Sequence, residues 1–257
     1  MKTNKTRAGL LALACAAILA ACGGGSGGSD PAPFIPTAEG AYTGSLSNSP
    51  YKAFELLVLE NGDFWSIYGT QSGGSFVVAG FLQGTGTTGR GSFVSTNSKD
   101  FGSVPAASVP TNATFDATAK TISGTIAAPA GTVGFSGAPL PSSIYNYATA
   151  ASLATVAGTW AATSLTGEKV NLTVAAGGAF TASSASGCNF SGTVAPRASG
   201  KNVFNVAVTY GPSPCALAGQ AATGIALAYP TGTGQTQWIV AVTDAGRTVG
   251  SALFAVK

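Results

Sequence analysis

From residue 38 onward, apolar and polar residues alternate in short runs along the chain. In residues 170–174 (VNLTV) and again in residues 204–210 (FNVAVTY), every second side chain is apolar. A period of two predicts β-strands that bury one face in a core and turn the other face to water. The 3.6-residue period of an amphipathic helix is nearly absent, and one short helical turn is expected in 150–156.

These runs lie between clusters of Gly, Asn, Asp and Ser, which are residues typical of turns. In the first half of the chain, the expected strands are 40–46, 53–60, 64–70, 75–84, 89–96, 111–117, 121–128 and 131–136. In the second half, they are 157–164, 168–175, 179–184, 188–195, 202–210, 222–229, 235–243 and 247–256. Asn61-Gly62-Asp63 lies between two apolar runs and indicates a tight hairpin.

The two halves of the chain repeat one plan. Gly40-Ala41-Tyr42 corresponds to Gly158-Thr159-Trp160, and Gly62-Asp63-Phe64 corresponds to Gly178-Ala179-Phe180. The pattern therefore predicts an all-β protein with two tandem small antiparallel β-barrels or curled meanders of about eight strands each. Closure is favoured because open strand edges with few charges aggregate. A barrel of this size holds its own side chains or one small ligand.

The first 21 residues have the pattern of an export signal. Lys2, Lys5 and Arg7 precede an apolar run over 8–21. As a helix, this run would rise about 21 Å, which is short of the roughly 30 Å of hydrocarbon in a bilayer. We therefore expect a secretory signal peptide over 1–21.

Leu19-Ala20-Ala21-Cys22 resembles the lipobox of bacterial lipoproteins. The resemblance implies diacylglyceryl transfer to the Cys22 thiol, cleavage before Cys22 and acylation of the new amine, so that acyl chains attach the protein to a membrane. Because Gly23 is not the aspartate associated with retention in the inner membrane, it also implies the outer membrane, with the periplasmic or outer face left open. The alternative is an ordinary secretory signal with an incidental cysteine.

The rest of the chain divides by composition. Residues 22–38 are expected to be a disordered, lipidated tether, because they are rich in Gly, Ser and Pro. The first β domain is predicted over 39–141 and the second over 157–257. Residues 142–156 between them are expected to be a linker that contains the short helical turn.

Composition and charge exclude several kinds of chemistry. The chain has 257 residues, is 45% apolar and 8% charged, and contains no His. Without His, Ser-His-Asp and Cys-His catalysis and imidazole metal sites are excluded. Removing the three basic residues of 1–21 leaves nine basic and nine acidic residues, so nothing favours nucleic acid as a partner. The acidic residues lie at predicted strand ends and turns, so we expect no enzyme, no metal and no cofactor.

Cysteine usage fits an exported protein. Cys15 leaves with the signal peptide and Cys22 is expected to be acylated, which leaves Cys188 and Cys215. Two thiols in an oxidising compartment favour a disulfide bond between them over a metal or redox site. Closing that loop would stabilise the fold by roughly 3–4 kcal/mol.

Aromatic residues are the candidates for a binding or packing surface. Phe64 and Trp65 are neighbours on a predicted strand, so one of the pair is expected outside the sheet's core, between the domains or at a partner's surface. The candidates for exposed aromatic residues are Phe64, Trp65, Tyr68, Tyr145, Tyr147, Tyr210, Tyr229 and Trp238.

Gly158-Thr159-Trp160 resembles the Gly-x-Trp signature of lipocalins. The resemblance implies that Trp160 closes one end of a barrel and that a late arginine, here Arg247 at the start of the last strand, packs over it. We interpret Trp160 as core packing rather than as a ligand contact.

Two further resemblances concern the plan of the chain. A lipobox, a Gly-rich stalk and two Gly-rich β domains are similar to tandem small-barrel lipoproteins of Gram-negative outer membranes, including transferrin-binding and complement-factor-binding surface lipoproteins. The segment 187–192 (GCNFSG) with the later Cys215 resembles a set of uncharacterised proteobacterial lipoproteins that carry Gly-Cys-x-Phe-x-Gly. That set implies a fold and no activity.

Together these features favour a lipid-anchored cell-envelope protein with a non-catalytic binding or interaction role. One alternative is a lipocalin-like carrier of a small apolar ligand, which requires an interior cavity of several hundred Å³. The other is an inhibitor of a periplasmic hydrolase, for which the loop 211–218, pinned by Cys215, is the candidate inserting segment. The partner is expected to be a protein or a small apolar ligand, beside the membrane that the acyl chains on Cys22 enter.

Overall fold

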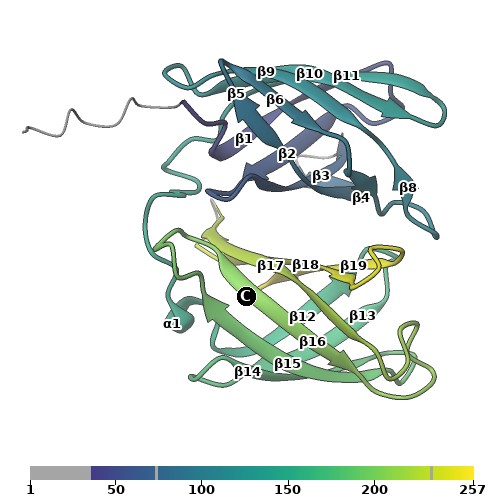
Figure 1. Cartoon of the computed structure of the whole chain (residues 1–257). Coiled ribbons are helices and arrows are strands. Elements are labelled where there is room, and N and C mark those ends of the chain that lie inside the picture. The colour runs from purple at the N-terminus through teal and green to yellow at the C-terminus, as the bar shows by residue number, and fades with distance from the viewer. Residues whose placement is uncertain (1–35, 73–74, 232–233) are drawn as a thin grey trace, which may run out of the picture. The chain divides into compact units, whose positions relative to one another are not determined.

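The computed structural model describes residues 36–72, 75–231 and 234–257. The expected signal peptide over 1–21, the expected acylation site Cys22 and residues 22–35 of the tether lie outside these ranges. Within them the fold is all-β, with two antiparallel sheets and one helix, α1 (Leu153–Val156), inside the expected helical segment (Figure 1). No helix among the described residues is long and apolar enough to span a bilayer.

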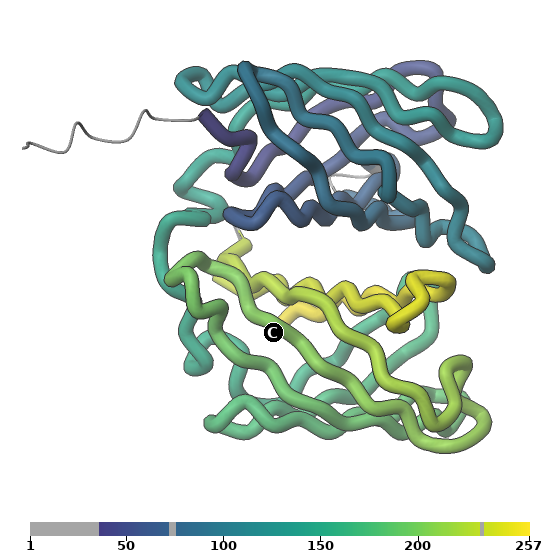
Figure 2. Tube along the Cα trace, viewed as in Figure 1, coloured from purple at the N-terminus to yellow at the C-terminus, as the bar shows by residue number. Residues whose placement is uncertain are grey.

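The first sheet has eleven strands in the order β5-β6-β9-β10-β11-β1-β2-β3-β4-β7-β8, and it is curled (Figure 2). Its strands are β1 (Gly40–Ser47), β2 (Ala53–Val58), β3 (Asp63–Ser72), β4 (Ser75–Thr85), β5 (Thr87–Gly89), β6 (Ser92–Ser95), β7 (Lys99–Asp100), β8 (Ala107–Ser108), β9 (Thr111–Asp116), β10 (Thr121–Ala128) and β11 (Gly131–Pro139). The expected hairpin at Asn61-Gly62-Asp63 joins β2 to β3.

The expected single strand over 89–96 is wrong. Arg90 and Gly91 have φ angles of 49° and 82°, so the chain makes a tight turn there and pairs β5 with β6. Two consecutive residues with positive φ are typical of the type I′ hairpin turn. The strands β7 and β8 have two residues each, too few for an alternating pattern to indicate them.

The second sheet is a closed barrel of eight consecutive strands. They are β12 (Gly158–Ser164), β13 (Lys169–Val174), β14 (Ala179–Ser184), β15 (Asn189–Pro196), β16 (Phe204–Tyr210), β17 (Ala221–Pro230), β18 (Thr236–Asp244) and β19 (Gly250–Val256). The ring closes where β12 pairs with β19, with Ala161 opposite Val256. The expectation of eight hairpin-linked strands in this half is confirmed.

Corresponding residues of the two halves make the same hydrogen bond. Tyr42 donates its hydroxyl to the carbonyl of Ala38, four residues earlier, at 2.7 Å. Trp160 donates its indole N–H to the carbonyl of Val156, also four residues earlier and also at 2.7 Å. Both rings are buried, so each bond satisfies a polar group inside a core and fixes how the chain enters the first strand.

The segment 187–192 is explained by structural requirements. Gly187 lies in the β14–β15 turn with a φ of 91°, which side chains rarely adopt. Cys188 forms the expected disulfide bond with Cys215. Phe190 packs against Tyr210, with ring centroids 5.4 Å apart. Gly192 has no room for a side chain, because a Cβ there would lie 1.9 Å from the carbonyl oxygen of Ala207.

Trp65 lies outside the core of the first sheet. This was expected of either Phe64 or Trp65, because neighbouring residues on a strand point to opposite faces of the sheet. Phe64 is buried in that core, whereas Trp65 is half-buried and packs on residues of both sheets, among them Leu57 and Ile225. The ring of Trp65 stacks on Phe81 with centroids 6.0 Å apart. The interpretation that Trp65 covers a seam between the sheets therefore agrees with its contacts.

An ion pair also joins the two sheets. Glu60, in the β2–β3 turn, accepts a hydrogen bond from Arg197, which follows β15, with 2.7 Å between Oε1 and Nε. Desolvation opposes ionisation of Glu60, but the hydrogen bond and positive charge of Arg197 outweigh it and lower the pKa of this carboxyl.

A Gly192→Ala variant is expected to lower the free energy of unfolding by about 2 kcal/mol, because the new methyl group must displace backbone. Gly177→Ala is the matched control: a Cβ there would have no neighbouring heavy atom within 4 Å, so its effect is expected to stay within about 0.5 kcal/mol. Urea unfolding followed by tryptophan fluorescence measures both. Equal losses in the two variants would contradict the steric explanation.

A Glu60→Gln variant tests the ion pair through its pH dependence. Because the folded-state pKa lies below the ordinary 4.5, the stabilisation is complete above that value and is lost as the pH falls through the folded-state pKa. We expect the variant to cost up to about 1 kcal/mol at pH 7 and less as the pH falls below 4.5, as determined by urea unfolding. A cost that does not change with pH would show that the ion pair does not contribute.

Candidate ligand-binding site

The inner face of the first sheet encloses an apolar cavity of about 280 Å³. Its walls come from strands that are distant in sequence, because the sheet curls. The apolar side chains of the wall include Leu46, Phe54, Leu56, Phe64, Leu82, Phe93, Ile122 and Phe135. Many of them also form the core of this sheet. Exposed residues of two turns, Asn48 and Pro50 before β2 and Ala130 and Gly131 before and at the start of β11, also line the cavity, so it reaches the surface there.

Aromatic rings shape this cavity by lying over glycines on neighbouring strands. Phe64 is directly opposite Gly84, and Tyr68 is directly opposite Gly80. A Cβ at Gly84 would lie 2.8 Å from the ring of Phe64, and one at Gly80 would lie 2.2 Å from the hydroxyl of Tyr68. The two rings therefore occupy the space that a side chain at Gly84 or Gly80 would need. Both rings also line the cavity.

Two polar side chains of the wall, Tyr68 and Asp100, bind each other. Tyr68 donates a hydrogen bond of 2.7 Å to Oδ1 of Asp100, and the backbone N–H of Gly102 donates to the same oxygen. Asp100 is the only charged residue among those that line the cavity. Burial of Tyr68, together with its hydrogen bond to Asp100, raises the pKa of its phenol, so Tyr68 stays protonated and remains a donor.

Of the aromatic candidates from the sequence, Phe64 and Tyr68 reach this cavity, and Trp65 lies elsewhere, in the sheet seam. The sequence did not indicate that Asp100 belongs to this site. Its hydrogen bond with Tyr68 forms only because β7 pairs with β4. The expectation of exposed aromatic residues is also wrong: all eight candidates are buried or half-buried.

Arg247 does not pack over Trp160. It lies in the turn after β18, with a φ of 52°, and donates a hydrogen bond of 2.7 Å to the carbonyl of Gln83 in the first sheet. Trp160 instead packs on Trp238, with ring centroids 5.2 Å apart, and Nζ of Lys257 lies 4.2 Å from the centroid of the Trp160 ring. Trp238 lies near the opposite end of β18, about 20 Å along the strand from Asp244, where that turn begins.

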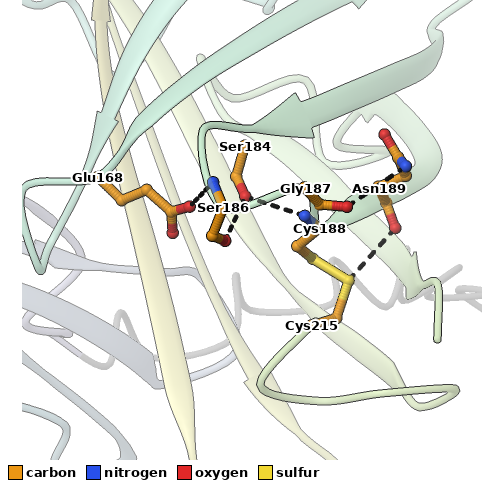
Figure 3. The surroundings of a disulfide bond; sticks show 7 residues. All are labelled: Glu168, Ser184, Ser186, Gly187, Cys188, Asn189 and Cys215. Carbon is orange, nitrogen blue, oxygen red and sulfur yellow. Dashed lines mark hydrogen bonds between the residues drawn. A yellow bond between two sulfur atoms is a disulfide. The ribbon is translucent and has the colours of Figure 1, made fainter. Parts of the chain in front are cut away.

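The barrel holds a second cavity of about 290 Å³, and the disulfide loop lies at its mouth. Cys188 and Cys215 are joined, with their Cα atoms 4.6 Å apart (Figure 3). Cys215 and Leu217 are buried, and Leu217 lines the cavity, so the loop 211–218 covers the barrel. The exposed part of the loop includes Pro212, Ser213 and Pro214.

Hydrogen bonds order the turn beside the disulfide. Glu168 accepts from the backbone N–H of Ser186 at 2.8 Å, and Ser184 accepts from the backbone N–H of Cys188 at 3.2 Å (Figure 3). Hydrogen bonds from Ser186 and Ser184 lower the pKa of Glu168, which keeps a negative charge at the mouth. No group of three or more Cys, Asp or Glu residues that could hold a metal ion occurs within 36–72, 75–231 and 234–257.

The fold and the cavities define an all-β protein built from a curled sheet and a closed barrel. No family model matches the chain, and no curated protein matches it. Among solved structures, immune modulator A of Aeromonas veronii is similar at 12% sequence identity and a TM-score of 0.37, over 84% of this chain and 93% of that chain.

Proposed function

We propose that this protein is a lipid-anchored protein of the bacterial outer membrane that binds a small apolar ligand, without catalysis, in the cavity of the first sheet. The observation that carries the proposal is the cavity of about 280 Å³ inside the curled sheet. Ligand sites of soluble proteins are concave, mainly apolar and largely preformed, with a few polar groups that fix orientation. The cavity has each of these properties.

The size of the cavity sets the size of the ligand. An engineered cavity of about 150 Å³ lined by Leu, Ile and Phe side chains binds benzene. The cavity of the first sheet is almost twice as large, so it suits a molecule with two fused or linked rings or a short branched chain.

The polar wall sets the chemistry of the ligand's head. Oδ1 of Asp100 already accepts hydrogen bonds from Tyr68 and from the backbone of Gly102. The carboxylate therefore favours a ligand whose apolar body carries an amine or another hydrogen-bond donor. We infer binding rather than catalysis, because the chain has no His and Tyr68 retains its proton.

The anchor places this site at a membrane. Acylation of Cys22 would add about 0.8 kcal/mol of membrane affinity for each buried methylene, and two or three chains give stable attachment. The folded body that begins near Pro36 would then be held close to the bilayer, so a ligand released from the envelope would meet the cavity close to its source.

An Ala128→Phe variant tests the binding site. Ala128 lines the cavity, so the new ring is expected to fill it and to weaken binding of N-phenyl-1-naphthylamine, an apolar amine, by about tenfold or more. Ala127→Phe is the matched control, because Ala127 is exposed on the other face of β10 and its variant should bind as the wild type does. Fluorescence titration of the full chain carrying Cys22→Ala measures both, free of detergent. Equal affinities of the two variants would exclude the cavity as the site.

A Cys22→Ala variant tests the anchor in cells. We expect it to lose incorporation of an alkyne-labelled fatty acid and to move from the membrane fraction to the soluble fraction, because the acyl chains are its attachment. Cys15→Ala is the control and should keep both properties. A Cys22→Ala protein that still carries the label would overturn the proposed anchor without affecting the ligand site.

A further inference from the structure

The cavity inside the closed barrel reaches the surface at one end, the mouth. Thr166 in the β12–β13 turn, Ser186 in the β14–β15 turn and Ala216 in the disulfide loop 211–218 are exposed, and all three line the cavity. These segments lie at the same end of the barrel, because they follow alternate strands of an antiparallel ring. A molecule can therefore enter the barrel between them.

Behind the mouth, the wall of the cavity is apolar. Along β18 the cavity extends from Val242 to Trp238, about 14 Å of strand. Its volume of about 290 Å³ is almost twice the roughly 150 Å³ that holds benzene in an engineered cavity. An elongated apolar group therefore fits this space. The other aliphatic residues of its wall include Val170, Leu172, Val194, Val206, Val208, Val240 and Leu253.

The mouth carries one carboxylate. Glu168 is the only charged residue among the described residues that line the cavity. Hydrogen bonds from the side chains of Ser186 and Ser184 and from the backbone N–H of Ser186 lower its pKa, so it is ionised. Its neighbour Lys169 donates to the hydroxyl of Thr163 instead. Because the protein already supplies donors to this carboxylate, the site favours a ligand that pairs with it by charge.

Two aromatic rings lie at the same end of the cavity. Phe190, near the start of β15, is directly opposite Tyr210, the last residue of β16, and their ring centroids are 5.4 Å apart. Both residues are half-buried and line the cavity. Desolvation raises the pKa of Tyr210 more than its hydrogen bond with Ser251 lowers it, so the phenol stays neutral. Neutral aromatic rings attract quaternary ammonium groups, so the mouth combines two features that favour such a cation.

From these observations we infer that the closed barrel is a second ligand site, for a molecule with an apolar chain that ends in a quaternary ammonium group. The chain lies among the valines, and the cation lies at the mouth with Glu168, Phe190 and Tyr210. This site does not rest on the proposed function of the first sheet. Its ligand carries a permanent charge and needs no hydrogen-bond donor, whereas Asp100 favours a donor.

The test uses two probes with the same chain, decyltrimethylammonium and decyldimethylamine N-oxide, whose head has no net charge. Both are titrated calorimetrically, below the concentrations at which they form micelles, into the full chain carrying Cys22→Ala and Ala128→Phe, which keeps the first cavity filled. We expect this parent chain to prefer the ammonium. The preference is expected to fall by about 2- to 5-fold in Glu168→Gln, which removes the charge and keeps an acceptor for Ser186.

Asp116→Asn is the matched control, because it removes the same charge from a turn of the first sheet. Asp116 also accepts backbone hydrogen bonds, from Thr118 and Ala119, but does not line the barrel cavity. Its variant should keep the preference of the parent chain. Equal losses in Asp116→Asn and Glu168→Gln would overturn the site, because they would show that the cation responds only to net charge.

Nuclear Overhauser effects on the parent chain give the position of the ammonium probe without any change at Glu168. We expect contacts from the N-methyl protons to the rings of Phe190 and Tyr210, and from the chain to the methyl groups of Val206 and Val240. A bound probe that lacks the valine contacts would exclude the barrel as the site. Either failure leaves the Ala128→Phe comparison unaffected, because that comparison uses a different probe and the other cavity.

Discussion

The structure depends on large rings that lie over glycines on the neighbouring strand. Phe54 faces Gly44, Phe64 faces Gly84 and, in the barrel, Phe180 faces Gly192. A Cβ at any of these glycines would come within 2.9 Å of the ring. A strongly curved sheet has little room on its inner side for side chains. In each Phe–Gly pair, only the ring occupies that room, because two side chains there would clash. The abundance of Gly in the chain is therefore a packing requirement as well as a source of turns.

Most strands could be predicted from the sequence because one face of each strand is buried and the other is not. The prediction was wrong at Arg90, where a non-glycine residue adopts positive φ, although Gly89 and Gly91 on either side are typical of turns. Trp238 was wrongly expected at the surface for a different reason. In β18, Val240 and Val242 face the barrel core while Ala241 packs on Phe81 of the first sheet, so both faces are buried and the alternation disappears. The cavities could not be predicted, because they depend on how far side chains reach across a curved sheet.

One plan of strands gives two different enclosures. In the second half, β12 pairs with β19 and the barrel closes around a cavity of about 290 Å³ whose wall includes several valines. In the first half, β1 lies between β2 and β11 and the order runs out to β5 and β8, so the sheet curls without closing on itself. Phe54 and Phe135 pack edge to face, with ring centroids 5.7 Å apart, and both line the cavity on its inner face. Similar volumes thus acquire different walls and different polar groups.

The position of β1 decides how the body responds to pulling. The chain enters it through Ala38, which is fully buried, and Tyr42 fastens that entry. Because β1 is bonded along its length to β2 on one side and β11 on the other, tension applied ahead of Pro36 runs parallel to the strand and loads both ladders in shear. Hydrogen bonds loaded together resist rupture far better than bonds opened one at a time. The body can therefore stay folded under drag at the end where a tether would hold it.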